Sequence, residues 1–413
     1  MKKPSRIAAL HLLGFLSAIA GPVTTVPWNG HTGAVSYTYY DARVSQLPNL
    51  LPQLDSLKIK ATFEIAITGV GTFSANRAAW MQVSRNGHEL ANHTYPHTSL
   101  SDANAAGLVK DMADTLRRLD TSIQSVTFAY PNCVVPGTTG KSGVSAENFL
   151  ARGCGQTTYA WGTQPSDWMN IQGLILSPTN TSTSVTMQNT AKTSNAWFVT
   201  IMHDVANPTP DQYSVTPANN LVMLNAGISN GLWIDTYLNV GAYYRAHFTM
   251  DTATARPYQT TTTAGWNLTW TSPHPKMPRS VLLRVKFAAA TFGTNFTVQQ
   301  NGVTIPAETD GSYIIDFMKL SMTVVQGTTG IKSRVILPSK LDARVTRNGI
   351  VFGGVFGEVE ATVVDIRGHM LFHGRVSNRV VPLRQDQMQG VLFLKLTNPA
   401  SGISVRTMVN AVR

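Results

Sequence analysis

The stretch Gly87-His88-Glu89-Leu90-Ala91-Asn92-His93-Thr94-Tyr95-Pro96-His97 is the most informative part of the sequence. We expect its beginning, His88–Ala91, to form a short strand. His93 and His97 follow four residues apart, and two imidazoles at this spacing can face one metal ion on a helical turn or in a tight loop. Imidazole nitrogen suits zinc and similar divalent ions. The stretch therefore predicts a divalent metal site, with zinc as the expected ion, directly after a strand.

Two histidines alone do not make a catalytic metal site, because a histidine pair is more often a polar surface or core feature. A third ligand is available in Asp41, which follows a predicted strand over Ser36–Tyr40. One aspartate and two histidines leave coordination positions open for water, which is the arrangement of catalytic rather than structural metal sites. We therefore take Asp41, His93 and His97 as the candidate ligand set.

Strands and helices alternate in the region around this stretch, from about residue 33 to 245. The apolar and amphipathic periodicity predicts strands over 34–40, 61–67, 88–91, 126–130, 197–203 and 232–236, and helices over 47–57, 75–85 and 101–119. Alternating β and α units predict a parallel sheet, either open or closed into a barrel.

The beginning of the chain is typical of an export signal. Lys2, Lys3 and Arg6 form a positive region, an apolar run covers 7–19, and Ala18-Ile19-Ala20 fits a cleavage site. We therefore expect residues 1–20 to be a signal peptide and the protein to be secreted or held at the bacterial cell surface. No later segment reaches 18 consecutive apolar residues, so the sequence predicts no transmembrane helix.

The remaining chain divides by composition. We expect a catalytic domain over 21–247, a linker over 248–278, a small β-module over 279–330 and a basic β-domain over 331–413. The linker is indicated by its threonine run and a Pro-His-Pro segment, and the β-module by alternating apolar residues with Asn-Gly and Asp-Gly turns.

The positive charge of the chain is concentrated at its carboxyl-terminal end. The 413 residues carry a net charge of +11 although only 13% of them are charged. Residues 21–330 hold 18 basic and 17 acidic residues, whereas residues 331–413 hold 12 basic and 5 acidic residues. The nearly neutral middle has no basic stripe with interleaved aromatic residues, which argues against nucleic-acid binding there. The positive charge therefore belongs mainly to the last domain, and it indicates an anionic partner for that domain.

Cys133 and Cys154 are the only cysteines. In an exported protein they could form a disulfide, and they could equally be two buried thiols. The sequence leaves this choice open because it does not place their Cα atoms.

Five short motifs occur in chain order and carry a family resemblance. They lie at Thr38–Ala42, His93–His97, Ala129–Asn132, Asp167–Trp168 and Ile201–His203. This set resembles the polysaccharide deacetylases, the NodB-homology group of carbohydrate esterase family four. The resemblance implies an α/β fold, namely a distorted (β/α) barrel, here followed by small all-β modules.

The resemblance also implies roles for individual residues. Asp41, His93 and His97 would hold the divalent metal, and His203 would protonate the leaving amine or alcohol. These four positions match the motif residues that carry the same roles in the family.

Three further positions follow from the resemblance. Asp167 would orient His203, a backbone N–H near Asn132 would stabilise the oxyanion, and Trp168 would lie in the cleft. The implied substrate is an acetylated polysaccharide, either O-acetyl xylan or a polymer of N-acetylglucosamine.

The chain departs from the family at the general base, where Tyr40 replaces an aspartate. Tyrosine is a poor base at neutral pH, and a general base contributes roughly 10²–10⁴-fold to rate. Ala129 also replaces the arginine that orients this base in many relatives. Two interpretations follow, a deacetylase that can be weak or a carbohydrate-binding pseudoenzyme. Glu64 and Asp204 are substitute bases in principle, although local hydrogen-bond partners are the simpler interpretation of both.

Two weaker patterns complete the sequence-level picture. Gly227–Gly231 matches the nucleophile pattern of serine hydrolases at Ser229, but a helix precedes it and a strand follows, the reverse of the required context. Val363–Gly368 followed by Gly390–Leu394 resembles the sorting domains of type IX secretion, which implies contact with secretion machinery. The alternative for this last unit is an accessory β-sandwich without a sorting role.

Overall fold

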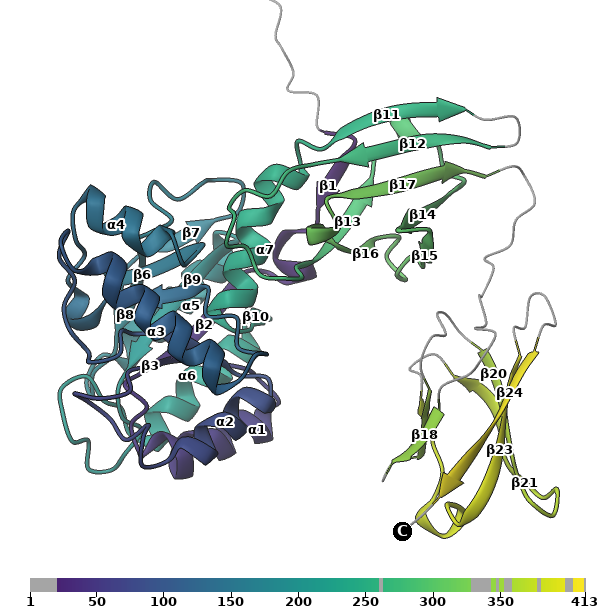
Figure 1. The fold of residues 1–413 in the computed structure, drawn as a ribbon, viewed down its shortest axis with the longest axis horizontal. Coiled ribbons are helices and arrows are strands. Elements are labelled where there is room, and N and C mark those ends of the chain that lie inside the picture. The colour runs from purple at the N-terminus through teal and green to yellow at the C-terminus, as the bar shows by residue number, and fades with distance from the viewer. Residues whose placement is uncertain are drawn as a thin grey trace, which may run out of the picture. The chain divides into compact units, whose positions relative to one another are not determined.

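A computed structural model describes residues 21–259, 263–327, 343–346, 349–352, 359–376, 380–397 and 404–411. The predicted signal peptide lies outside the described residues. The chain divides into two compact units, residues 1–254 with 270–277, and residues 255–269 with 278–413 (Figure 1). Within the described residues, no helix has the length and apolarity that crossing a membrane requires.

A closed parallel sheet forms the centre of the first unit. Its strands are β2 (Ala34–Tyr40), β3 (Thr62–Ile65), β4 (Glu89–Asn92), β5 (Thr127–Ala129), β6 (Leu150–Cys154), β8 (Ile171–Ile175) and β9 (Ala196–Met202). Each pairs in parallel with the next in this order, and β2 also pairs with β9 over Ala34–Tyr39, which closes the ring. The predicted (β/α) barrel is therefore confirmed. Two short strands extend the sheet, β10 (Trp233–Ile234) beside β2 and the antiparallel β7 (Thr158–Ala160) beside β9.

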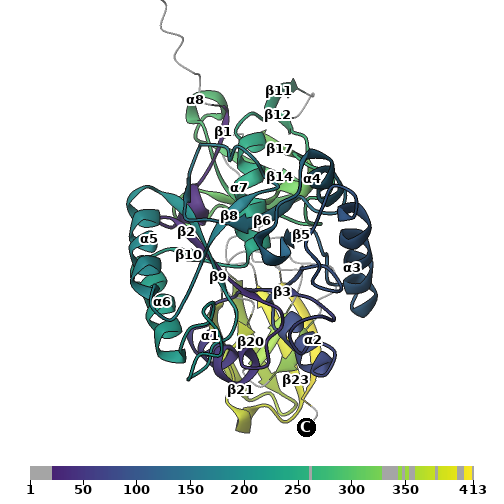
Figure 2. The same cartoon turned by 90° about the vertical axis from the view of Figure 1, so that its left-hand side faces the viewer.

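Helices surround the barrel on its outside (Figure 2). They are α1 (Leu51–Leu57), α2 (Arg77–Arg85), α3 (Ala105–Leu119), α4 (Thr138–Ser145), α5 (Thr181–Thr193), α6 (Pro217–Ser229) and α7 (Tyr237–Met250). Short β1 (Val23–Thr25), the 3₁₀ turns Pro27–Gly30 and Pro131–Cys133, and the π-helical turn Gln46–Leu50 complete the unit. The helix expected from residue 101 begins at Ala105, because Ser101 and Asn104 first exchange hydrogen bonds of 2.7 and 3.3 Å between their backbone and side chains.

The amino-terminal end of the barrel is held together by one buried carboxylate, that of Glu89. It accepts hydrogen bonds from the hydroxyls of Thr62 (2.7 Å) and Thr127, and from the backbone N–H of Leu238 (2.9 Å). Three strands and the first turn of α7 therefore meet at this side chain. All three partners donate, so the side chain at position 89 has to accept several hydrogen bonds at once, which a carboxylate can do.

The second unit consists of antiparallel β-sheets. One sheet has the order β11-β12-β17-β14-β15, and β13 pairs with β16. The bounds are β11 (Thr254–Gln259), β12 (Ala264–Thr269), β13 (Leu282–Phe287), α8 (Ala289–Phe292), β14 (Phe296–Gln300), β15 (Val303–Ile305), β16 (Tyr313–Asp316), the 3₁₀ turn Phe317–Lys319 and β17 (Ser321–Gln326). The segment 248–278, expected to be a linker, thus contributes two strands. β12 pairs with β17 over Gly265–Thr269, a long-range contact that the composition of the segment does not report.

The carboxyl-terminal part of this unit has two further sheets. One orders β18 (Ala343–Thr346), β19 (Gly349–Phe352) and β22 (Val380–Val381), and the other orders β21 (Met370–Val376), β20 (Val359–Asp365), β23 (Gly390–Thr397) and β24 (Ser404–Ala411). A short 3₁₀ turn covers Gln385–Gln387. Buried side chains from both sheets form one hydrophobic cluster.

We predict that Glu89→Ala destabilises the protein by about 3 kcal/mol, because it leaves three buried donors without an acceptor. The measurement is the free energy of unfolding in urea. Asp111→Ala, at an exposed position of α3, is the control and should change that free energy by less than about 0.5 kcal/mol. Equal effects of the two substitutions would contradict the role assigned to Glu89.

Candidate metal centre and active site

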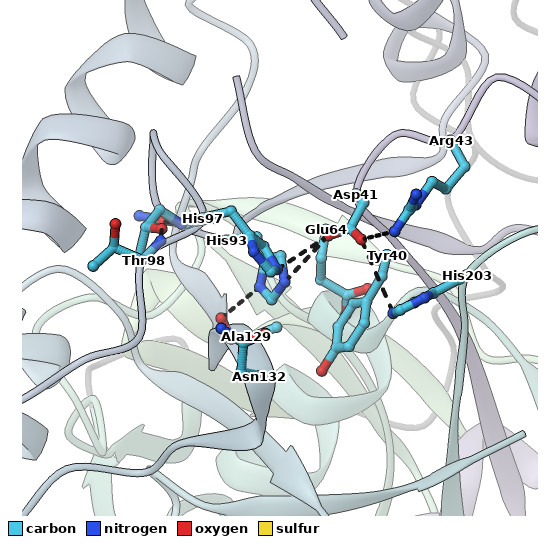
Figure 3. A network of polar contacts seen from close by, with 12 residues as sticks. Tyr40, Asp41, Arg43, Glu64, His93, His97, Thr98, Ala129, Asn132 and His203 are labelled. Atoms are coloured by element: carbon cyan, nitrogen blue, oxygen red, sulfur yellow. Dashed lines mark hydrogen bonds and ion pairs between the residues drawn. The ribbon is translucent and has the colours of Figure 1, made fainter. Parts of the chain in front are cut away.

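Asp41, His93 and His97 lie together at the carboxyl-terminal ends of the barrel strands (Figure 3). Asp41 follows β2 and His93 follows β4, so parallel strand direction brings both to one rim, where barrel enzymes place their active sites. His97 reaches the same point from the loop after β4, in a left-handed conformation with φ of 55°. One ligand atom from each of the three residues lies within 4.8 Å of the others.

The hydrogen bonds of His93 show that this cluster fits a cation. Its Nδ1 lies 2.8 Å from the carbonyl oxygen of Ala129, which only accepts, so Nδ1 carries the proton and Nε2 has a free lone pair. Nε2 faces Asp41 Oδ1 at 3.5 Å, and His97 Nε2 lies 3.4 Å from the same oxygen. Asp41 Oδ1 and His93 Nε2 are buried and have no hydrogen-bond partner among the described residues. Acceptors directed at one another in this way are stabilised by a positive ion between them.

Burial also keeps the two imidazoles neutral. Desolvation lowers the pKa of His93 to about 3, in spite of the opposing effect of Asp41. Desolvation lowers the pKa of His97 as well. A neutral imidazole is the form that binds a metal ion. The two histidines are therefore in the protonation state that a divalent metal requires.

Arg43 holds the other oxygen of Asp41. Its Nη2 donates to Asp41 Oδ2 at 3.0 Å, which leaves Oδ1 directed at the histidines. The loop is also closely packed here, since a Cβ on Gly71 would lie 1.6 Å from the carbonyl oxygen of Asp41. Backbone packing and an ion pair together fix the orientation of the carboxylate.

His203 lies beside the side chains of Asp41, His93 and His97, and it forms a polar contact with Asp211. His203 Nε2 is 4.0 Å from Asp41 Oδ2, while Nδ1 is 3.1 Å from Asp211 Oδ2. Burial acts to raise the pKa of Asp211, but hydrogen bonds from Ser214, His203 and the backbone of Tyr213 outweigh it and lower that pKa. Asp211 is therefore an ionised carboxylate that orients His203 and favours a proton on Nδ1.

The predicted pairing of Asp167 with His203 is corrected by this geometry. Asp167 instead forms an ion pair of 2.7 Å with Lys141 and accepts from the backbone N–H of Met169. The motif-like Asp-Trp pair drew attention to Asp167, whereas Asp211 lies in no recognisable motif. A carboxylate eight residues after His203, in a polar loop, was the only sequence signal for it.

Tyr40, at the position where the resemblance expects the general base, does not direct its hydroxyl toward the side chains of Asp41, His93 and His97. Its ring stacks on His93 at 4.5 Å between centroids, and its hydroxyl accepts a 2.7 Å hydrogen bond from Arg152 inside the barrel. Desolvation raises the pKa of Tyr40 to about 12, with Arg152 opposing this effect. The phenol is therefore protonated at neutral pH, and its ring rather than its hydroxyl faces His93.

Arg152 lies beside Ala129, the position at which the resemblance expects an arginine. In the sheet, Arg152 of β6 is the direct neighbour of Ala129 of β5. Its guanidinium crosses the barrel interior to Tyr40 and to Glu64, whose Oε1 lies 2.8 Å from Nη2. Both charged side chains are almost fully buried, at 0% and 2% exposure. Sequence reasoning missed Arg152, and its one signal was a charged residue within the apolar segment 149–154.

Glu64 and Asp204, the two alternative bases, have other partners. Desolvation raises the pKa of Glu64 to about 7, while Arg152 opposes the shift. Asp204 accepts a 2.6 Å hydrogen bond from the hydroxyl of Ser45. Neither residue lines the cavity described next, and both are accounted for by these local contacts.

A cavity of about 410 Å³ opens beside the side chains of Asp41, His93 and His97. It is lined by Tyr40, Asp41, Arg43, Val70, His97, Asn132, Cys133, Ile175, Ile201, His203 and Tyr213. The predicted oxyanion residue Asn132 is thus brought to the site, with left-handed φ of 55°. Trp168 is not among the lining residues, and it packs against Tyr244 with centroids 5.5 Å apart. Ser229 is the last residue of α6, so the strand-turn-helix context of a serine nucleophile is absent there.

Cys133 and Cys154 form a disulfide with their Cα atoms 5.5 Å apart. This settles the alternative that the sequence left open. The bond joins the turn that carries Asn132 to the end of β6, two residues after Arg152. The cavity wall and the strand that carries the buried arginine are therefore covalently connected.

Comparison with known proteins agrees with this geometry. The family model described as Polysaccharide deacetylase matches residues 29–146. A probable peptidoglycan-N-acetylglucosamine deacetylase of Arthroderma benhamiae is 28% identical over 115 residues, which is 26% of this chain and 25% of that protein. A chitooligosaccharide deacetylase of Rhizobium leguminosarum bv. phaseoli is 26% identical over 125 residues, 29% of this chain and 50% of that protein. The chain thus matches a quarter to a half of the length of these relatives.

Among solved structures, a putative polysaccharide deacetylase from Mycobacterium smegmatis aligns with a TM-score of 0.39 and 16% identity. The alignment covers 55% of this chain and 95% of that one. The family match includes Asp41, His93 and His97 and ends before His203 and Asp211.

We predict that the native protein binds one divalent ion per chain, with zinc as the test ion, and that His93→Ala lowers the affinity more than about 100-fold. Loss of a ligand should cost more than loss of an outer partner, which typically costs 10–100-fold. Metal content after dialysis and competition with a chromogenic chelator are the measurements. His203→Ala is the control and should retain the ion. Equal metal content in the native protein and His93→Ala would exclude this ligand set.

The buried Arg152–Glu64 pair leads to a stability prediction. Arg152→Met should cost about 3 kcal/mol of unfolding free energy, because it leaves the Glu64 carboxyl buried without its counter-charge and its hydrogen bond and so raises its pKa further above 7. The double variant Arg152→Met/Glu64→Leu should recover most of this loss, since no buried charge remains. Denaturant unfolding of the two single variants and the double variant measures the coupling. If the losses simply add, the two charges do not act as a pair.

Proposed function

We propose that the protein is a metal-dependent deacetylase of an extracellular polysaccharide. The observation that carries the proposal is the convergence of Asp41, His93 and His97 with the His203–Asp211 pair on one cavity at the rim of the barrel. The family match over residues 29–146 supports the same reaction class. The fold alone would not, because barrels of this kind host many reactions.

The ligand set defines the chemistry available in the cavity. A divalent metal held by Asp41, His93 and His97 would polarise an acetyl carbonyl and lower the pKa of a water molecule. Arg43 keeps the Asp41 carboxylate in the orientation that the ligand set needs. The apolar wall formed by Val70, Ile175 and Ile201 would exclude bulk water and contact the acetyl methyl group.

His203 is the residue that moves the proton. With Nδ1 bonded to Asp211, its Nε2 is directed toward the cavity, where it can take a proton from the attacking water and pass it to the leaving amine or alcohol. Asp211 fixes the orientation of this ring through Nδ1, in the same way that a carboxylate orients a catalytic histidine elsewhere. The backbone N–H at Asn132 would donate to the oxygen that becomes negatively charged.

The position of the usual general base has no carboxylate, and this shapes the expected activity. Among the described lining residues, Asp41 is the only carboxylate, and it belongs to the ligand set. His203 is then the one lining side chain outside that set with a proton-accepting nitrogen. A slow enzyme that relies on His203 is therefore the primary proposal. A carbohydrate-binding pseudoenzyme is the second, and it is favoured by the protonated Tyr40 ring in the base position.

The substrate class remains an acetylated sugar polymer. The relatives are named for peptidoglycan N-acetylglucosamine and chitooligosaccharide. We extend this by proposal to O-acetyl xylan or polymers of N-acetylglucosamine, including chitin and peptidoglycan. The near-neutral charge of residues 21–330 suits an uncharged polymer. Export to the cell surface or medium, and sorting through the carboxyl-terminal domain, are proposals from the sequence.

The test is acetate release from acetylxylan and from chitooligosaccharides. We expect the native protein to release acetate, a chelator to stop the release, and His203→Ala to lower the rate about 10²–10⁴-fold. Asp211→Asn should also lower it, whereas Asp167→Asn is the matched control and should not. Equal rates for Asp211→Asn and Asp167→Asn would remove Asp211 from the site.

Tyr40→Asp separates the two proposals within the same assay. An inactive native protein that gains acetate release in this variant is a pseudoenzyme that lacks only its base. An active native protein whose rate rises is the slow enzyme proposed above. A fast native protein that Tyr40→Asp leaves unchanged would contradict our account of the base.

A further inference from the structure

The outward face of the sheet β21-β20-β23-β24 carries an apolar row. The strand register aligns Met370, Val364, Phe393 and Met408 across all four strands. Met370, Phe393 and Met408 are 63%, 41% and 67% exposed. Surface apolar residues are ordinarily scattered, so an aligned row of this kind marks an interaction site.

These residues are not part of the hydrophobic core of their own domain. On β23, Leu392, Leu394 and Leu396 are fully buried, and Phe393 lies between them on the opposite face. Strand alternation therefore separates the two sets, with one face packed and the other open to solvent. The nearby side chain of Ile366, 69% exposed, extends the open apolar surface.

A basic row runs beside the apolar row on the same face. The register aligns His373, Thr362, Lys395 and Arg406. The next row begins with Arg375 and Glu360, and Glu360 pairs with His373 at 3.3 Å. A groove of about 560 Å³ lies along the two rows and is lined by Thr362, Val364, Phe393, Leu394, Lys395, Arg406, Thr407 and Met408.

The apolar row and the basic row together indicate which kind of molecule fits this face. A second copy of the chain would bring its own basic row to this face. Among the described residues of these rows, Arg375, Lys395 and Arg406 stand against one acidic side chain, Glu360, so the copies would repel. A neutral sugar chain would find a single aromatic ring, that of Phe393, as a stacking surface. An anionic amphiphile matches both rows, and the excess of 12 basic over 5 acidic residues in 331–413 adds long-range attraction.

We propose that this face docks on an anionic lipid surface. The apolar row would enter the boundary between headgroups and acyl chains, and Lys395 and Arg406 would contact lipid phosphates. The inference goes beyond the deacetylase proposal, because it concerns the second unit and none of its residues belongs to the metal centre. Each can fail without the other.

Co-sedimentation of the full chain with lipid vesicles tests the proposal. We expect binding to vesicles of equal parts phosphatidylcholine and phosphatidylglycerol, weakening with added salt, and little binding to phosphatidylcholine alone. Lys395→Gln/Arg406→Gln should weaken binding roughly 25-fold, since each cation near such a surface contributes about fivefold. Phe393→Ser should also weaken vesicle binding, and this loss should persist at high salt because the substitution removes an apolar contact rather than a charge.

Lys286→Gln/Arg344→Gln is the matched control. It removes the same charge from β13 and β18, outside the face, and should retain nearly native binding. Equal losses in the two double variants would show that net charge alone attracts the protein and would overturn the proposed face. Absence of binding to the anionic vesicles would overturn it as well. So would a concentration-dependent dimer, seen by sedimentation without lipid, that Phe393→Ser dissociates.

Discussion

The pairing of β2 with both β3 and β9 is the constraint on which the site depends. It closes the parallel sheet, so that the ends of β2, β4 and β9 meet at one rim. Asp41 follows the first of these strands, His93 the second and His203 the third. An open sheet would separate β9 from β2 by the width of the whole array. Closure therefore converts three distant sequence positions into one pocket, and at the opposite end of the barrel the buried Glu89 joins β4 to β3, β5 and α7.

Closure also creates an interior that has to be filled, and here the chain fills it with charge. Arg152, Glu64 and the Tyr40 hydroxyl form a compact hydrogen-bonded group inside the barrel. A buried guanidinium is costly unless it is paired and hydrogen-bonded. Here Nε and Nη1 donate to Glu64 and Tyr40, whereas Nη2 is paired with Glu64 by charge and has no hydrogen-bond partner among the described residues. The same group turns the Tyr40 hydroxyl away from the cavity, so that only its ring faces His93. The Tyr40 hydroxyl is thus held by an arginine from a different strand, and the two side chains form one structural unit.

The two units of the protein differ in the arrangement of their charged side chains. Around the metal centre, charges are few and paired: Arg43 with Asp41, Asp211 with His203, and Arg152 with Glu64. On the sheet of β20, β21, β23 and β24, cations stand beside exposed apolar side chains and have few acidic partners. The first pattern suits a neutral substrate held in a small cavity, and the second suits a broad anionic surface.

Local periodicity predicted a parallel sheet, open or closed, with most of its strands and helices, and the resemblance carried by the short motifs predicted the barrel. The same motifs singled out Asp41, His93 and His97, which the structure brings together. They predicted the position of His203 as well. They could not find Arg152 or Asp211, since each acts on a partner far along the chain or in an irregular loop, and no periodicity reports such contacts. Asp167 was chosen on motif position and lies elsewhere for the same reason. The folded chain alone shows that Cys133 and Cys154 pair, that Tyr40 directs its hydroxyl inward, and that apolar and basic rows share one face. These features arise from distances between segments, which the closed barrel and the strand registers set.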